Sequence, residues 1–166
     1  MKKIILIRHA KSDWDNPSLP DYDRPLAARG LEDAPKMAAL LKNRAIKVDG
    51  ILSSTAKRAK QTAQITAQVL GIPETSMEWD RSLYHASADH LLHVIQAQPT
   101  HLQTLILVGH NPGLTELIVR LGVNLDNLPT AGQFAFTVLS DDWKNLSAAN
   151  CKFDWWDSPK KLGTAG

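Results

Sequence analysis

The stretch Lys3-Ile4-Ile5-Leu6-Ile7-Arg8-His9 decides the fold of this chain. Its aliphatic run is typical of a strand buried on both faces of a parallel sheet, and the histidine follows where the strand ends. A second run, Leu105-Ile106-Leu107-Val108, is followed in the same way by Gly109-His110. Ligands of open α/β sheets bind in the crevice outside the carboxyl ends of the strands, so both histidines are expected there. With arginines nearby, the pair indicates a site that holds an anion and attacks it.

Extended and helical segments alternate along the rest of the chain, which predicts an α/β fold. One of Ser53, Ser54 and Thr55 is expected to cap the second helix. Pro35 lies inside the first helical pattern, so that helix should begin near Asp33 or be kinked. The predicted strands cover 3–7, 48–52, 76–79, 104–108, 134–139 and 152–156, and the predicted helices cover 31–41, 56–70, 87–95 and 114–121.

Length and composition favour one domain, 1–166, with a flexible tail expected only over 160–166. A net charge of +2 is too small to argue for a nucleic-acid partner. No apolar run approaches the roughly 18–20 residues that span a bilayer, so no membrane partner is expected either. The single cysteine, Cys151, agrees with a reducing compartment, and the apolar run after Met1 is too short for a secretory signal. A cytoplasmic location is therefore expected.

A phosphoryl-transfer site without a metal needs a nucleophile, fixed positive charge and a proton donor. His9, in its neutral form, is the candidate nucleophile, and the guanidinium of Arg8 matches a phosphate with two parallel hydrogen bonds. Arg58 lies in the first turn of the second predicted helix, whose N-terminus would face the same anion. His110 could donate to another oxygen. Three strand ends would then converge on one phosphate.

Plainer interpretations exist for several of these features. A histidine at a strand end is usually a hydrogen-bonding or packing residue, and an arginine in a first helical turn is usually solvated. His90 and His93 lie three apart on a predicted helix, but no third ligand of suitable spacing accompanies them, so no metal site is predicted. No glycine-rich phosphate loop is present, so nucleotide binding has no support. Residues 11–29 are polar and contain three prolines, which predicts a long loop of the kind that is usually functional.

Three motifs resemble the signatures of the histidine phosphatase superfamily, in the same order and at plausible spacing. They are Leu6-Ile7-Arg8-His9-Ala10-Lys11-Ser12, a variant of the Arg-His-Gly motif, then Ser53-Ser54-Thr55-Ala56-Lys57-Arg58-Ala59-Lys60-Gln61-Thr62-Ala63, and Val108-Gly109-His110-Asn111-Pro112-Gly113. The chain further resembles the short, SixA-like phosphohistidine phosphatase branch at Asp23-Arg24-Pro25-Leu26, Leu83-Tyr84 and Pro129-Thr130-Ala131-Gly132. The resemblance extends from Lys3 to about Leu139.

This resemblance implies a three-layer α/β sandwich, with a mostly parallel sheet, helices on both faces and an antiparallel edge strand. It also implies that His9 takes the phosphoryl group and that water then removes it, without a metal or an organic cofactor. Arg8, Arg58 and His110 would form the phosphate pocket. Further candidates for binding phosphate or substrate are Lys11, Ser12 and Arg24.

The chain departs from the superfamily pattern at the general acid. Many members carry a glutamate where this chain has Leu83-Tyr84-His85. The remaining candidates for the proton donor are His85 and the loop carboxylates, with Asp15 and Asp23 favoured and Asp13 and Asp21 in the same loop. An imidazole leaves more readily than an alkoxide, because the P–N bond is labile once the ring is protonated. Phosphoramidates are therefore expected as substrates in preference to sugar phosphates.

The sequence thus predicts a cytoplasmic phosphatase acting on a histidine-phosphorylated protein, such as a histidine-containing phosphotransfer domain. Short connections after Leu70 leave little chain for a lid, and an open site suits a side chain displayed on a protein. The same pocket would also serve a phosphatase for a small phosphorylated metabolite. A weakly active phospho-binding module is a third alternative.

Overall fold

Six strands form one mixed sheet in the computed structural model, which describes residues 1–165 and side chains as far as residue 162. The strand order is β3-β2-β4-β1-β5-β6. The first four strands of the chain run parallel, β5 is antiparallel to β1, and β6 at the edge is antiparallel to β5. The prediction of a mostly parallel sheet with antiparallel pairing at one edge is confirmed. The strands are β1 Lys2–Arg8, β2 Gly50–Ser53, β3 Met77–Trp79, β4 Thr104–Gly109, β5 Gln133–Val138 and β6 Cys151–Asp157.

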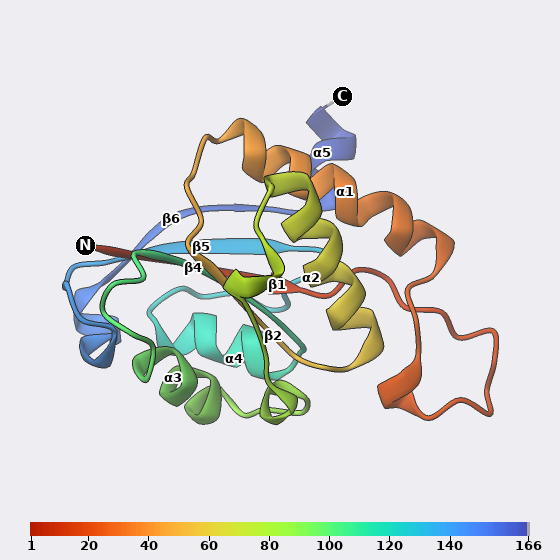
Figure 1. Cartoon of the computed structure of the whole chain (residues 1–166), viewed down its shortest axis with the longest axis horizontal. Coiled ribbons are helices and arrows are strands. Elements are labelled where there is room, and N and C mark those ends of the chain that lie inside the picture. Colours follow the sequence, from red (N-terminus) through yellow and green to blue (C-terminus); the bar gives the residue numbers. More distant parts are fainter. Residues whose placement is uncertain (166) are drawn as a thin grey trace.

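Helices cover both faces of this sheet, which confirms the three layers (Figure 1). Ile5 and Ile7 of β1 pack with α1 and α2, whereas Ile4 and Leu6 pack with α3 and α4 on the other face. All four side chains are buried, and each is expected to contribute about 1.5–3 kcal/mol through burial. The helices are α1 Ala28–Asn43, α2 Lys57–Leu70, α3 Ala88–Gln96, α4 Gly113–Arg120 and α5 Pro159–Ala165.

Helix α1 begins at Ala28 and continues through Pro35, so of the two predicted alternatives the start near Asp33 was wrong. A proline inside a helix costs about 3 kcal/mol, because it removes one backbone hydrogen bond and crowds the preceding turn. Burial of the apolar face outweighs that cost, since each large side chain buried is worth about 1.5–3 kcal/mol. The buried side chains of this face are Ala34, Met37, Ala38 and Leu41.

Helix α2 follows β2 without a side-chain cap. Ala56 occupies the N-cap position, so the predicted cap among Ser53, Ser54 and Thr55 was wrong. The Ser54 hydroxyl instead accepts a hydrogen bond from the N–H of Ala56 at 3.2 Å. Ser54 is therefore free to contact a residue from another strand end.

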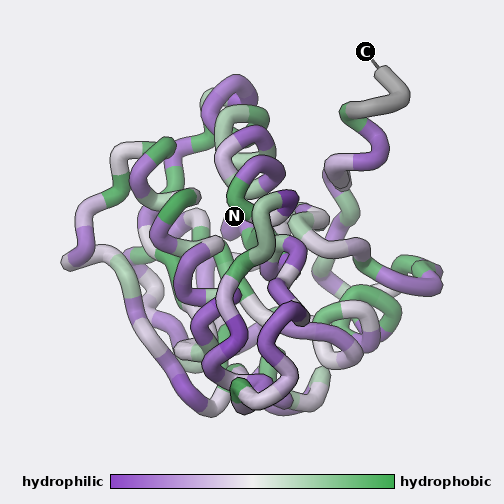
Figure 2. The backbone as a smooth tube through the Cα atoms, turned by 90° about the vertical axis from the view of Figure 1, so that its right-hand side faces the viewer, coloured by the Kyte–Doolittle hydropathy of each residue, from purple (hydrophilic) through white to green (hydrophobic). Residues whose placement is uncertain are grey.

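The long loop predicted after β1 spans residues 11–27 and is closed at its base. Ser12 and Leu26 form an antiparallel bridge, and the Ala27 N–H donates to the Lys11 carbonyl at 2.9 Å. Gly30 in the first turn of α1 packs closely against the backbone of Lys11, because a Cβ at this position would lie 2.2 Å from the Lys11 carbonyl oxygen. The loop extends beyond the carboxyl ends of the strands at the right of Figure 1, and this side of the molecule is largely hydrophilic in Figure 2.

The end of the chain lies beside α1. The sequence predicts a flexible tail over 160–166, whereas the structure has helix α5 as far as Ala165, and residue 166 lies outside the described part. Leu162 of α5 is half-buried against a small cluster that includes Met37 of α1. Among the described residues, no helix is both long and apolar enough to cross a bilayer.

Candidate active site

Three strand ends and the 11–27 loop enclose a cavity of about 240 Å³. Arg8 and His9 come from the end of β1, Arg58 from the first turn of α2 after β2, and His110 from the end of β4. The structure therefore brings together the four residues that the sequence proposed as the catalytic set. The cavity is lined by Arg8, His9, Lys11, Ser12, Trp14, Asp21, Arg58, His85, His110, Asn111 and Thr130.

The backbone on both sides of His9 is tied to neighbouring chain segments. Its N–H donates to the Gly109 carbonyl at 3.2 Å, and its carbonyl accepts from the Ala131 N–H at 3.0 Å. The Ala10 N–H donates to the Thr62 hydroxyl of α2 at 3.0 Å. These bonds join the end of β1 to the end of β4, to the segment before β5 and to α2, so the ring of His9 is held at the floor of the cavity.

The tautomer of His9 follows from its hydrogen bonds. Nδ1 lies 2.7 Å from the carbonyl oxygen of Ala10, which can only accept, so Nδ1 carries the proton. Nε2 lies 3.3 Å from the Nε–H of Arg58, so Nε2 carries the lone pair. Burial, together with the charges of Arg58 and Arg8, lowers the pKa of His9 to about 4. His9 is therefore neutral at physiological pH and presents a nucleophilic nitrogen.

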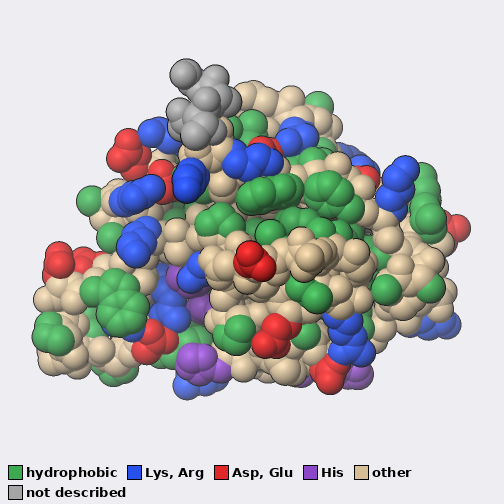
Figure 3. All heavy atoms as spheres, turned by 180° about the vertical axis from the view of Figure 1, so that it is seen from behind, with side chains coloured by type: hydrophobic (Ala, Val, Ile, Leu, Met, Phe, Trp, Pro, Cys, Tyr) green, Lys and Arg blue, Asp and Glu red, His purple; other side chains and the backbone are tan. Residues whose placement is uncertain are grey.

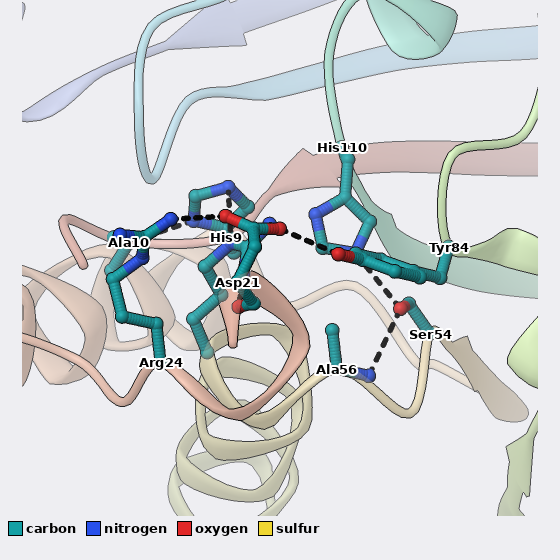
Figure 4. Close-up of polar contacts among 9 residues, drawn as sticks. His9, Ala10, Asp21, Arg24, Ser54, Ala56, Tyr84 and His110 are labelled. Carbon is teal, nitrogen blue, oxygen red and sulfur yellow. Dashed lines mark hydrogen bonds and ion pairs between the residues drawn. The ribbon is translucent and has the colours of Figure 1, made fainter. Parts of the chain in front are cut away.

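His110 lies beside His9, with the two ring centroids 5.1 Å apart. Its Nε2 is 2.8 Å from the Ser54 hydroxyl, which also receives the Ala56 N–H (Figure 4). Its Nδ1 is buried and has no hydrogen-bond partner in the described part of the protein. Burial, followed by the charge of His9, lowers the pKa of His110 to about 3. If Ser54 donates to Nε2, Nδ1 carries the proton and is available to an anion in the cavity.

Two guanidinium groups supply the positive charge. Arg58 is only 7% exposed, and the Arg8 Nη1 donates to the Leu128 carbonyl at 3.0 Å. Burial and the nearby charge of Arg58 both lower the pKa of Arg8. Two like charges held beside two neutral histidines favour an anionic ligand, because such a ligand would relieve their mutual repulsion.

The 11–27 loop places one carboxylate in this cavity, that of Asp21. Arg58 donates to its backbone carbonyl at 2.7 Å and to its Oδ2 at 2.9 Å, and the Tyr84 hydroxyl donates to the same Oδ2 at 2.6 Å. Arg24 pairs with the other oxygen, Oδ1 (Figure 4). Partial burial raises the pKa of Asp21, but the hydrogen bonds from Tyr84, Arg24 and Arg58 outweigh it and hold the pKa well below its usual range. Asp21 is therefore an ionised acceptor.

The other predicted residues divide into two groups. Lys11 and Ser12, the candidates for contact with substrate, line the cavity, and so does His85, a candidate proton donor. Arg24 is held beside the cavity by Asp21 and by the ring of Trp14, whose centroid lies 3.3 Å from the guanidinium carbon. The exposed carboxylates Asp15 and Asp23 do not line the cavity.

Sequence reasoning did not single out three residues that build the site, namely Tyr84, Ser54 and Thr62. Thr62 links Arg58 to the segment after His9, because its hydroxyl donates to the Arg58 carbonyl at 2.8 Å and accepts from the Ala10 N–H. Its position four residues after Arg58 on one helix was the available signal. Asp21 was one of four similar aspartates in the loop, and no local pattern separates it from the others.

No metal-binding cluster is apparent across residues 1–165, since no group of at least three His, Cys, Asp or Glu side chains is placed to hold an ion. His90, one of the pair considered in the sequence, contacts the Ser82 hydroxyl at 2.7 Å.

Comparisons with known proteins agree with this geometry. Residues 4–83 match the model of the histidine phosphatase superfamily, branch 1. An Arabidopsis thaliana protein, At3g52155, described as uncharacterized and chloroplastic, is 32% identical over 162 residues, covering 93% of this chain and 74% of its own. The structure of SixA from Agrobacterium tumefaciens is 28% identical with a TM-score of 0.79, covering 95% of this chain and 99% of that one. A protein histidine phosphatase SixA complexed with tungstate is 24% identical with a TM-score of 0.81, covering 96% and 99%.

Proposed function

The chain belongs to the histidine phosphatase superfamily and is a phosphatase, and we propose that it hydrolyses phosphohistidine on a protein through a phosphorylated His9. One observation carries the choice of substrate. Among the described residues, Asp21 is the only carboxylate that lines the cavity, and its hydrogen bonds hold it ionised, so it cannot protonate a leaving oxygen. A leaving imidazole carries its own proton on the second ring nitrogen and needs no such acid.

The two displacements balance with the protons already in place. His9 Nε2 forms a bond to phosphorus, the P–N bond of the substrate breaks, and its electron pair returns to the substrate ring as neutral imidazole. Throughout this step the Nδ1–H of His9 remains on the Ala10 carbonyl, which stabilises the positive ring of phospho-His9. Water then attacks phosphorus, the bond to Nε2 breaks, and dihydrogen phosphate leaves.

Around the transferred group, each predicted residue has a distinct task. Arg8 and Arg58 neutralise the charge on the phosphoryl oxygens, as positioned donors do in most phosphoryl transfers. His110 Nδ1 donates to another oxygen, which would satisfy an atom that has no hydrogen-bond partner among the described residues. Lys11 and Ser12 add contacts from the rim. The neutral histidines let these cations act without further repulsion.

A protein is the proposed carrier of the phosphohistidine. Figure 3 shows Lys and Arg side chains, with some Asp or Glu side chains among them, around the region at the left of the view where histidines are visible. Such a surface suits an acidic, phosphorylated partner, for example a histidine-containing phosphotransfer domain. The SixA protein from Agrobacterium tumefaciens carries the name of a phosphohistidine phosphatase. The cytoplasmic location stays a prediction, and the Arabidopsis relative is described as chloroplastic.

Phosphate release from a histidine-phosphorylated domain, measured with a chelator present, tests this function. Wild type should release phosphate, and His9→Ala should abolish release. His93→Ala is the matched control, because His93 is exposed on α3 and does not line the cavity. Turnover of small phosphate esters by a wild type that leaves the phosphorylated domain intact would contradict the proposal and favour a metabolite phosphatase.

A further inference from the structure

We propose that Asp21 is a specificity-determining residue that accepts a hydrogen bond from the free ring N–H of the phosphohistidine leaving group. The inference rests on the proposed function and goes beyond it, because it assigns recognition of the imidazole to one side chain. Where many members of the superfamily carry a glutamate acid, this site would then present a carboxylate base that holds a proton on the substrate.

The position of Asp21 relative to the buried floor supports this assignment. His9 and Arg58 are 6% and 7% exposed, whereas the side chain of Asp21 is 40% exposed. Asp21 therefore lies nearer to solvent than the guanidinium that it contacts. A leaving group displaced by His9 departs on the side of phosphorus opposite the nucleophile, which is the outward side. The imidazole of the substrate would be in this layer.

The carboxylate has a free position for a donor. Two carboxylate oxygens offer about four lone-pair sites. Arg24 occupies one on Oδ1, and Arg58 and Tyr84 occupy two on Oδ2. One site on Oδ1 remains. All three neighbours are donors, so the carboxylate stays ionised and can only accept from the substrate.

The chemistry explains why an acceptor at this position helps. Once the distal ring nitrogen is protonated, cleavage of the P–N bond releases neutral imidazole, whereas an unprotonated ring would have to leave as a much more basic imidazolate. Imidazole rings titrate near neutrality, so part of the substrate lacks that proton at physiological pH. A carboxylate hydrogen-bonded to the N–H keeps the ring in its protonated form.

The same carboxylate discriminates against oxygen esters. An alkyl phosphate presents no cationic N–H to Asp21, and its leaving oxygen needs a proton that an ionised carboxylate lacks. The residue thus favours one class of leaving group and disfavours the other, which makes it a determinant of specificity rather than of phosphate binding.

The charged and titratable groups that face Asp21 come from several elements. Arg24 lies on the same loop, Arg58 on α2 and Tyr84 in the segment after β3, and the charge of Asp21 also acts on His9 and His110. The pKa values of His9 and His110, about 4 and about 3, lie below the range in which the substrate ring titrates. A change in the pH profile caused by altering Asp21 would therefore report the substrate ring.

The test compares Asp21→Asn with wild type on a histidine-phosphorylated domain and on p-nitrophenyl phosphate, between about pH 6 and 9, where imidazole rings titrate. With phosphohistidine, kcat/KM should fall roughly 10- to 100-fold, the size of one hydrogen bond to a charged group, and the loss should grow as pH rises. With the aryl ester, whose leaving group needs no acid, kcat/KM should stay unchanged or rise. Asp23→Asn is the matched control, because Asp23 makes the same charge change two residues away and does not line the cavity.

Three results would overturn the inference. An equal fall on both substrates would mean that Asp21 only holds Arg58 or the loop in place. An equal rise would mean that Asp21 only competes with phosphate for Arg58. No change with phosphohistidine would mean that the imidazole is recognised elsewhere. A wild type inactive on phosphohistidine overturns the proposed function itself, and this result is visible before any variant is compared.

Discussion

The floor and the wall of the cavity are built in different ways. The floor consists of Arg8, His9, Arg58 and His110. These side chains are buried or half-buried and lie at or shortly after the ends of three strands. The wall consists of the 11–27 loop, whose Asp21 side chain is 40% exposed and whose Trp14 is 64% exposed. Rigid strand ends suit the reacting phosphoryl group, which every substrate shares, and a loop suits the leaving group, which differs between substrates. The floor is therefore expected to fix the chemistry and the wall the choice of molecule.

The largest effect should come from removing a floor arginine and comparing it with a wall arginine. Arg58→Ala should lower kcat/KM roughly 100- to 1,000-fold on every phosphorylated substrate, because it removes positioned charge at the phosphoryl oxygens. Arg24→Ala should change kcat/KM on an aryl phosphate by about twofold or less, since Arg24 reaches the site through Asp21. Kinetics with an aryl phosphate, alongside circular dichroism to verify folding, would check both. Similar losses for the two variants would remove the distinction between floor and wall.

A smaller effect is expected on the pH dependence of stability, from the two histidines of the floor. Burial first, and then neighbouring charges, lower the pKa of His9 to about 4 and of His110 to about 3, whereas an unfolded histidine titrates near 6.5. Between pH 6.5 and 4 the unfolded chain binds more protons than the folded one, so the free energy of unfolding falls as pH falls. At about 1.4 kcal/mol per pKa unit, His9 alone accounts for about 3.5 kcal/mol of this fall in the free energy of unfolding.

Urea denaturation at several pH values would measure this slope. The double variant His9→Asn, His110→Asn should show a flatter dependence of unfolding free energy on pH across the same interval. The exposed His93→Asn serves as control and should keep the wild-type slope. An unchanged slope in the double variant would show that other groups cause the acid sensitivity.

The smallest effect is expected at the tip of the wall. Trp14→Ala removes the ring stacked on Arg24 and should lower the unfolding free energy by about 0.5–1 kcal/mol, the usual worth of an exposed cation–π contact. Turnover of an aryl phosphate should change by about twofold or less, because the floor is untouched. Leu19→Ala, an apolar truncation in the same loop, is the comparison. A large loss of aryl phosphatase activity in Trp14→Ala would show that the wall also organises the floor.

Much of the floor could be predicted from the sequence because strand ends are a local property. An aliphatic run followed by His9 or His110 fixes where a strand stops, and parallel strands bring such ends to one edge. Arg58 followed from its place in the first turn of a helix. The order of strands in the sheet then brought the three ends together without any further information from the loops.

The wall could not be predicted to the same degree, because tertiary contacts choose among chemically equal residues. Hydrogen bonds from Arg58 and Tyr84, both far from Asp21 in the sequence, hold Asp21 in the cavity. Asp15 and Asp23 remain exposed. Periodicity carries no information on that choice. The role of Ser54 was missed for a related reason, since its hydroxyl contacts His110 rather than capping α2 in the expected way.

The closed base of the 11–27 loop has a consequence for how such proteins diversify. The Ser12–Leu26 bridge and the hydrogen bond between Ala27 and Lys11 bring the two ends of the loop together. The segment between them is therefore expected to tolerate replacement. Its length and sequence can change without altering the path of β1 or α1. New substrate ranges can then arise by replacing one short segment while the floor stays unchanged. Redesign of substrate choice would therefore begin at this loop.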